Sequence, residues 1–224
     1  MLVSAIEGHR LWAPDYDTVP NPLLAVESRI LKHLLNGAAP RSVADVGCGT
    51  GRWMLHFNRA GSEVIGVDAC PEMLAQAALH RPLRGKLILG DAQDLPLADG
   101  VADLVVCSFT ASYIHGLNRL MHQLARITVA GGRIVLTDMH HVAAKAGWQR
   151  SFKRGASLYQ LKHFDYSPPQ FRVAAEAQGL YFETEAKGHF GDEEWILFHC
   201  ADKTHLYCEL ASIPAVWVGI WSKP

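Results

Sequence analysis

The chain has 224 residues, 49% of them hydrophobic, and its 21 Lys and Arg residues nearly balance 22 Asp and Glu residues. This length and composition suit a globular chain with a full core, and we expect one domain over residues 1–224. The balanced charge argues against a surface that neutralises the phosphate backbone of a nucleic acid. A small-molecule partner is therefore expected.

Five cysteines without a C-x-x-C pair argue against a disulfide framework and favour the cytoplasm. The group His199, Cys200, His205 and Cys208 lacks the spacing of structural zinc sites, so no bound metal is expected. Residues 1–14 contain charges and no long apolar run, unlike a secretory signal. No other stretch approaches the roughly 18 apolar residues that span a bilayer, so we expect no membrane span.

An amphipathic cap helix is predicted over about residues 21–36, beginning at Asn21-Pro22 and ending at Asn36-Gly37. From residue 42, short apolar runs alternate with helical patterns, which indicates βαβ units and a parallel sheet. The predicted elements are strand 43–46, helix 52–60, strand 64–67, helix 71–79, strands 87–89 and 103–107, helix 117–127 and strand 133–137.

The pattern changes after Asp138, where residues 139–166 are rich in aromatic and basic side chains. This segment is longer than an ordinary connection, so it is a candidate lid, partly helical. A helix then begins near Ser167-Pro168 and ends at Gly179, followed by strands at 180–184 and 215–221. These two strands, joined by the excursion 188–214, would add an antiparallel edge to a seven-stranded, mostly parallel α/β sheet with helices on both faces.

A glycine-rich turn, Gly47-Cys48-Gly49-Thr50-Gly51, closes the first strand of this sheet and opens the first core helix. Such a turn exposes helix N-terminal amides to a ligand and lets the backbone approach it closely. A dinucleotide fingerprint would place its third glycine at position 52, where Arg52 stands, and no Gly-Lys-Ser/Thr follows. Nicotinamide, flavin and phosphate-loop interpretations are therefore disfavoured.

Two carboxylates stand at the ends of the next two strands. Asp68 is placed to accept protons from both ribose hydroxyls of a nucleoside bound across the turn. Asp91-Ala92 offers a carboxylate to an exocyclic amine and a backbone N–H to a ring nitrogen. A glycine turn alone has a steric explanation. The combination of the turn with two acids at consecutive strand ends predicts a nucleoside-containing ligand.

These residues, with the strand 103–107 and Gly131-Gly132, resemble class I S-adenosylmethionine (SAM)-dependent methyltransferases, particularly the small-molecule group that contains ubiquinone/menaquinone methyltransferases. The resemblance covers about residues 16–138 and implies a Rossmann-like doubly wound fold with SAM as cofactor. One departure is Arg126-Ile127-Thr128-Val129-Ala130-Gly131-Gly132, where relatives usually have Arg-Val-Leu-Lys-Pro-Gly-Gly. This difference alters a turn outside the cofactor pocket.

The resemblance also implies roles for individual residues. Gly47, Gly49 and neighbouring backbone would hold the methionine moiety, and Asp68 the ribose. Asp91 and Ala92 would bind the adenine. The expected cofactor set is completed by Tyr16, which would close over the cofactor, Ser108, which would face the methionine end, and Asp45, Cys48 and Ala69.

Methyl transfer needs a positioned nucleophile that is often relieved of a proton. His115, after the fourth strand, is the leading candidate base, although it could instead hydrogen-bond the next helix. His140, after the fifth strand, could be a base or a substrate contact. A metal site with Asp138 and His141 is disfavoured because adjacent side chains on an extended chain point in different directions.

The acceptor is expected to be aromatic or amphipathic, and an anionic one would suit Lys153, Arg154 and Lys162. The alternative is that the aromatic residues of segment 139–166 simply pack a lid onto the sheet. Trp195 and Phe198 could cover the pocket, form core or lie in a homodimer interface. The acceptor atom stays open among O, N, C and S. A nucleic-acid methyltransferase and a SAM-binding protein without catalysis are the competing functions.

Overall fold

The computed structural model describes residues 1–224, and its main feature is a seven-stranded sheet in the order β4-β3-β2-β5-β6-β10-β9. Its strands are β2 (Ser42–Val46), β3 (Glu63–Asp68), β4 (Leu87–Leu89), β5 (Ala102–Ser108), β6 (Thr128–Met139), β9 (Tyr181–Gly188) and β10 (Val216–Ser222). The first five in this order are joined by parallel ladders. The carboxyl ends of β2 to β6 therefore meet at one edge of the sheet.

The last two strands add the predicted antiparallel pairing. β10 is antiparallel to both β6 and β9, so β10 lies one place inside the sheet and β9 forms its edge. β6 is longer than predicted and contains a bulge, in which residues 129–132 stand opposite Asp103. The predicted turn at Gly131-Gly132 lies within this bulge, where Gly131 has a φ of 76°.

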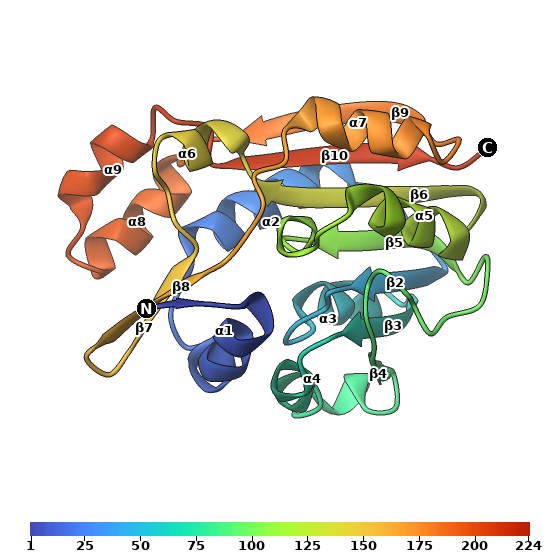
Figure 1. Cartoon of the computed structure of the whole chain (residues 1–224), viewed down its shortest axis with the longest axis horizontal. Coiled ribbons are helices and arrows are strands. Elements are labelled where there is room, and N and C mark those ends of the chain that lie inside the picture. The colour runs from blue at the N-terminus through green and yellow to red at the C-terminus, as the bar shows by residue number, and fades with distance from the viewer.

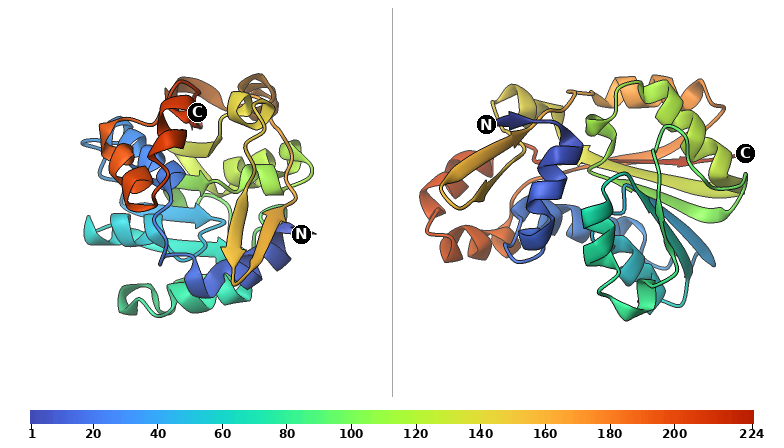
Figure 2. Two further views of the ribbon diagram at one scale, coloured as in Figure 1. Left: turned by 90° about the vertical axis from the view of Figure 1, so that its left-hand side faces the viewer. Right: turned by 60° about the horizontal axis from the view of Figure 1, so that its bottom comes forward.

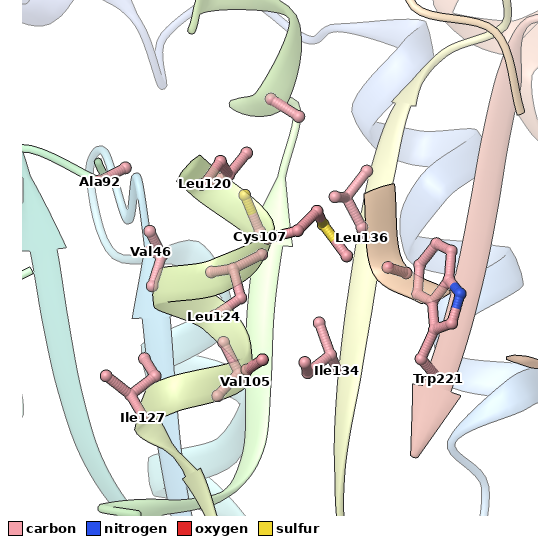
Figure 3. Packing of buried hydrophobic residues seen from close by; sticks show 14 of the residues in the cluster. Val46, Ala92, Val105, Cys107, Leu120, Leu124, Ile127, Ile134, Leu136 and Trp221 are labelled. Carbon is pink, nitrogen blue, oxygen red and sulfur yellow. The ribbon is translucent and has the colours of Figure 1, made fainter. Parts of the chain in front are cut away.

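Helices cover both faces of the sheet, as expected for a doubly wound fold. α5 (Leu117–Ile127) and α7 (Pro168–Glu176) pack on one face, and α2 (Pro22–Leu34) and α3 (Arg52–Arg59) pack on the other. Strand side chains alternate between them, so Val105 and Cys107 belong to the α5 side while Val106 belongs to the α3 side. Figure 3 shows this packing of α5, where Leu124 lies beside Val105 and Cys107.

A different group of elements gathers where β5 and β6 finish (Figures 1 and 2). It contains α1 (Ala5–Trp12), the hairpin β7 (Ser151–Arg154) and β8 (Ser157–Leu161), α8 (Asp192–Cys200) and α9 (Thr204–Leu210). β1 (Leu2–Val3) pairs in parallel with β8, so the first residues of the chain join the hairpin in a second, three-stranded sheet. These elements enclose the carboxyl edge of the large sheet.

The remaining elements are short: α4 (Pro71–Ala77), α6 (His141–Lys145), and the 3-10 helices η1 (Ala13–Asp15), η2 (Arg81–Leu83) and η3 (Ala111–Tyr113). The segment 139–166 thus contains one turn of helix and a hairpin. Sequence patterns did not predict α1, α8 or α9. None of the helices combines the length and apolar character needed to cross a bilayer.

Candidate functional site

A cavity of about 960 Å³ opens at the carboxyl ends of β2, β3, β4 and β5. Gly47, Asp68, Asp91 and Ser108 line it, each from the end of a different strand. The topology therefore brings together the turn and the two carboxylates that the sequence placed at consecutive strand ends. Such an edge is the usual ligand position in an open α/β sheet.

The glycine turn is held by contacts that exclude side chains. Gly47 has a φ of 73°, and a Cβ atom there would overlap the side chain of Thr110, which follows β5. The Gly47 amide donates to the carbonyl of Val67 over 2.7 Å, and the Gly49 amide donates to Oδ2 of Asp68 over 2.8 Å. The turn is thus fixed directly against the end of β3.

Each carboxylate oxygen of Asp68 accepts one hydrogen bond from the chain and has room for another. Oδ2 accepts the Gly49 amide, and Oδ1 accepts the Cys70 amide over 2.8 Å. Burial raises the pKa of Asp68, and these two amides oppose that change. Each carboxylate oxygen can accept a second hydrogen bond. The side chain is therefore oriented and still able to receive two hydroxyl protons from a ligand.

The loop after β4 forms another part of the cavity. Oδ1 of Asp91 accepts the Gln93 amide over 2.8 Å, and Ala92 is almost fully buried on the cavity wall. The Gln93 side chain donates to the carbonyl of His115 over 2.7 Å. His115 therefore lines the cavity beside the loop that the resemblance assigns to adenine, with its ring 5.3 Å from that of Phe164.

Ser108 lines the cavity, but its hydroxyl is already engaged. It donates over 2.6 Å to Oε1 of Glu27, a fully buried residue of α2. The same carboxylate accepts a 2.6 Å hydrogen bond from Thr137 on β6 and pairs with Arg52 at the start of α3. Glu27 thus joins the cap helix to two strand ends and the first core helix.

The N-terminal elements close another side of the cavity through Tyr16, Trp12 and His9. Tyr16 packs edge-on against Trp12 at 4.8 Å between ring centroids, and burial raises the pKa of Tyr16. The resemblance implies Tyr16, but sequence patterns did not predict the helix before it. The missed signal was Ser4-Ala-Ile-Glu7, a helix-start pattern in which the Ser4 hydroxyl accepts the Glu7 amide.

His9 has a defined neutral tautomer. Its Nδ1 lies 2.9 Å from the Ala5 carbonyl, and a carbonyl only accepts, so Nδ1 carries the proton. The other ring nitrogen, Nε2, is then an acceptor when the ring is neutral. Burial lowers the pKa of His9, while the nearby Asp68 carboxylate opposes this. The ring lies edge-on to Tyr113, with centroids 5.0 Å apart.

Three residues of the predicted site do not line this cavity: Asp45, Cys48 and His140. Asp45 is 2% exposed, and burial raises its pKa to about 7. Cys48 is buried with its sulfur toward Gly66 and its neighbour Met54. His140 begins α6 instead, where its Nδ1 accepts the Val142 amide over 3.2 Å. By contrast, Ala69 lines the cavity as predicted.

Beyond Ser108 the cavity wall is made by Phe109, Tyr113 and Arg150. Phe109 has a φ of 50°, an uncommon conformation for a bulky side chain that is frequent at functional sites. Arg150, before β7, forms a buried ion pair with Asp138 at the end of β6. Arg150 lies in the predicted lid segment 139–166, but no sequence pattern indicated a role for it.

The far end of the cavity is apolar. Its apolar lining residues from this region include Trp148, Phe190, Leu197, Phe198, Leu206 and Leu210, and the lining also contains the charged residue Lys203. Trp148 stacks on Phe190, with planes 6° apart and centroids separated by 5.5 Å. The excursion 188–214 therefore folds α8 and α9 onto the cavity. No group of three or more His, Cys, Asp or Glu side chains is arranged to hold a metal ion.

Comparison with known proteins agrees with this geometry. Residues 44–136 match the model of a protein family described as a methyltransferase domain. A demethylmenaquinone methyltransferase of Thermobifida fusca (strain YX) is 35% identical over 104 residues, which are 45% of this chain and 44% of that protein. The chain spans 28% to 56% of the length of four curated relatives that it matches.

Two solved structures share the fold over almost the whole chain. An S-adenosylmethionine dependent methyltransferase from Mesorhizobium loti has a TM-score of 0.70 at 19% identity, covering 90% of this chain and 99% of that one. The [4+2]-cyclase SpnF has a TM-score of 0.68 at 17% identity, covering 98% and 95%. The family match ends before Arg150, α8 and α9, so the apolar end of the cavity lies outside it.

Proposed function

We propose that the chain is a SAM-dependent methyltransferase that binds S-adenosylmethionine and transfers its methyl group to a small-molecule acceptor held in the same cavity. One observation carries the proposal. The cavity is continuous from Gly47, Asp68 and Asp91 to the apolar wall that contains Phe190 and Phe198. It therefore contains a region with carboxylates that suits a nucleoside and a separate apolar region.

The residues of the first region fit the cofactor. Asp68 keeps one free acceptor site on each oxygen, which suits a ribose diol. Asp91 and the backbone at Ala92 suit the amine and a ring nitrogen of adenine. Gly47 and Gly49 line the cavity beside them, where the methionine moiety would lie. Tyr16 covers this region from the N-terminal side, and Ala69 completes its wall.

SAM supplies an electrophilic methyl group on a sulfonium, and S-adenosylhomocysteine is the other product. The chain's own contribution is to orient the acceptor, exclude water and receive a proton where the acceptor must lose one. His115, the sequence-based candidate, lines the cavity near Asp91. His9 also lines it, and its Nε2 is free to accept a proton. The placement of His140 outside the cavity gives no support to a catalytic role for that residue.

The acceptor is proposed to be aromatic or amphipathic because of the apolar wall. A nucleic-acid substrate finds no support in the balanced charge of the chain. Catalysis other than methyl transfer is the alternative with a specific observation behind it, since the cyclase SpnF has the same fold. The homodimer stays a prediction, which sedimentation of the purified protein would test.

Calorimetric titration with SAM and S-adenosylhomocysteine tests the cofactor site. Saturable binding of both is expected, and Asp68→Ala should weaken it at least about 10-fold, the effect of losing charge-assisted hydrogen bonds. Asp94→Ala is the matched control, because Asp94 does not line the cavity. Absence of SAM binding by the wild-type chain would contradict the proposal. Transfer of labelled methyl to a panel of acceptors then separates methyl transfer from other catalysis.

Variants of the two histidines test the base. His115→Gln and His9→Gln should each leave S-adenosylhomocysteine binding measurable. The variant in which the catalytic base has been replaced should lower turnover about 100-fold or more. If turnover is unchanged in both, the acceptor loses its proton to water.

A further inference from the structure

Arg150 occupies an unusual place for an arginine. Its side chain is only 7% exposed, and yet it lines the cavity beside the end of β5. The guanidinium carbon lies 4.9 Å from the ring centroid of Tyr113 and 5.8 Å from that of Phe109. Both aromatic residues also line the cavity after Ser108, so Arg150 lies beside the carboxyl end of β5.

The hydrogen-bonding capacity of Arg150 exceeds what the chain supplies. Its Nη2 pairs with Asp138, and its Nη1 has a 3.5 Å contact with the Phe109 carbonyl. The Nε donor has no partner. A guanidinium has five N–H donors, and burying one without an acceptor is unfavourable. The structure therefore contains a buried cation whose donors are incompletely satisfied.

Asp138 contacts this cation through one nitrogen only, Nη2. Its Oδ2 accepts the Ser112 amide over 3.0 Å, and its Oδ1 accepts the Ser112 hydroxyl over 3.2 Å and the Met139 amide over 2.7 Å. The carboxylate is thus shared between Arg150 and three other donors. These contacts hold the carboxylate beside Nη2, so the ion pair leaves the Nε donor of Arg150 without an acceptor.

The other charges on this side of the cavity have the same sign. The lining residues after position 139 include Arg150, Lys153 and Lys203 but no Asp or Glu. The carboxylates of the lining, Asp15 and the two cofactor acids, all come from earlier in the chain. Cavity walls of one sign attract ligands of the opposite sign.

We infer that Arg150 binds an anionic group, a carboxylate or a phosphate, on an acceptor whose remaining body is apolar. The anion would lie at the guanidinium and the apolar body against Trp148, Phe190 and Phe198. This inference rests on the proposed function, because it assigns the second region of the cavity to the acceptor. It names the acceptor class without assigning the atom that is methylated.

The first test uses the wild-type chain saturated with S-adenosylhomocysteine. Octanoate, octyl phosphate, octanol and octylamine are titrated by calorimetry as probes of equal chain length. Octanoate or octyl phosphate is expected to bind at least about 10-fold more tightly than octanol, and octylamine least tightly. Whichever of the two anions binds more tightly shows whether Arg150 prefers a carboxylate or a phosphate. Equal affinities for the anions and octanol would overturn the inference.

The second test removes the cation. Arg150→Gln should abolish the preference for anions over octanol, whereas Arg154→Gln should retain it, because Arg154 is exposed on the same hairpin and does not line the cavity. Arg150→Gln leaves Asp138 buried without its ion-pair partner. The double variant with Asp138→Asn neutralises both groups and keeps the test available if the single variant does not fold.

The affinity for S-adenosylhomocysteine separates the possible failures. If the wild-type chain does not bind this product, the proposed function fails. If the wild-type chain binds S-adenosylhomocysteine and the folded Arg150 variants do not, Arg150 holds the cofactor and the inference is wrong. Retained product binding with a lost anion preference supports the inference.

Discussion

The hydroxyl of Ser108 donates a 2.6 Å hydrogen bond to Oε1 of Glu27, which links the cap helix α2 to the carboxyl end of β5. Glu27 is fully buried and also receives the Thr137 hydroxyl and the Arg52 guanidinium. A charged residue in the middle of a buried helix face is thereby compensated from three other elements. The network joins α2 to the ends of β5 and β6 and to the start of α3.

Replacing Glu27 with Gln should destabilise the chain by about 1.5–3 kcal/mol, the usual effect of losing hydrogen bonds to a charged group, because Arg52 is 32% exposed and stays partly hydrated. The amide has nearly the same shape, so lost charge and a mismatched donor are the cause. Urea denaturation measures the change. Glu193→Gln is the control, because the Glu193 side chain is 76% exposed, and it should change stability by less than about 0.5 kcal/mol. A loss below about 1 kcal/mol for Glu27→Gln would show that the network matters little.

Gly47→Ala should weaken S-adenosylhomocysteine binding at least about 10-fold. Its new Cβ atom would overlap Thr110, and the turn would have to shift away from Asp68. Gly37→Ala provides a matched comparison, since Gly37 has a φ of 78° and open space around it. Both variants carry the left-handed backbone strain of about 1–2 kcal/mol, but only Gly47→Ala should alter calorimetric binding. Equal affinities in the two variants would rule out the steric explanation.

Asp45 should make stability fall as pH rises. Burial raises its pKa from 3.8 to about 7 in the folded chain, so the folded state holds this proton more tightly than the unfolded state. Its contribution is present below about pH 4 and is lost as pH rises through about 7. Asp45→Asn lacks this titration and should gain stability relative to wild type by up to about 4 kcal/mol across that range. A difference between the two that is constant with pH would contradict this account.

His140 should make the stability of the folded chain fall as pH falls. Burial lowers its pKa from 6.5 to about 4, so the unfolded state binds the proton more tightly, and stability is lost as pH falls through this interval. His140→Asn keeps a side chain that can cap α6 but does not titrate. Relative to wild type, the variant should gain up to about 3 kcal/mol between pH 6.5 and 4 in urea denaturation. Its turnover at pH 7 should equal that of wild type, and a large loss would restore a catalytic role for His140.

The sequence by itself determined the central sheet and the convergence of the glycine turn and two carboxylates at one edge of it. Short apolar runs alternate with helical patterns, and this local signal located β2 to β5 and α2 to α5 to within a few residues, whereas β6 begins five residues earlier than predicted. Asp68 and Asp91 stand at strand ends, and carboxyl ends of parallel strands meet at one edge in any such sheet. Their convergence on one cavity therefore followed from topology alone.

Only the tertiary structure decided which side chains reach that cavity. Asp45 lies within the same motif as Gly47, but the alternation of β2 turns it toward the buried α3 side. His140 follows a strand end like Ser108, but it caps α6 instead. Arg150 and His9 reach the cavity because the hairpin and α1 fold back over the sheet edge. Contacts of this kind join residues far apart in the chain, and local periodicity carries no information about them.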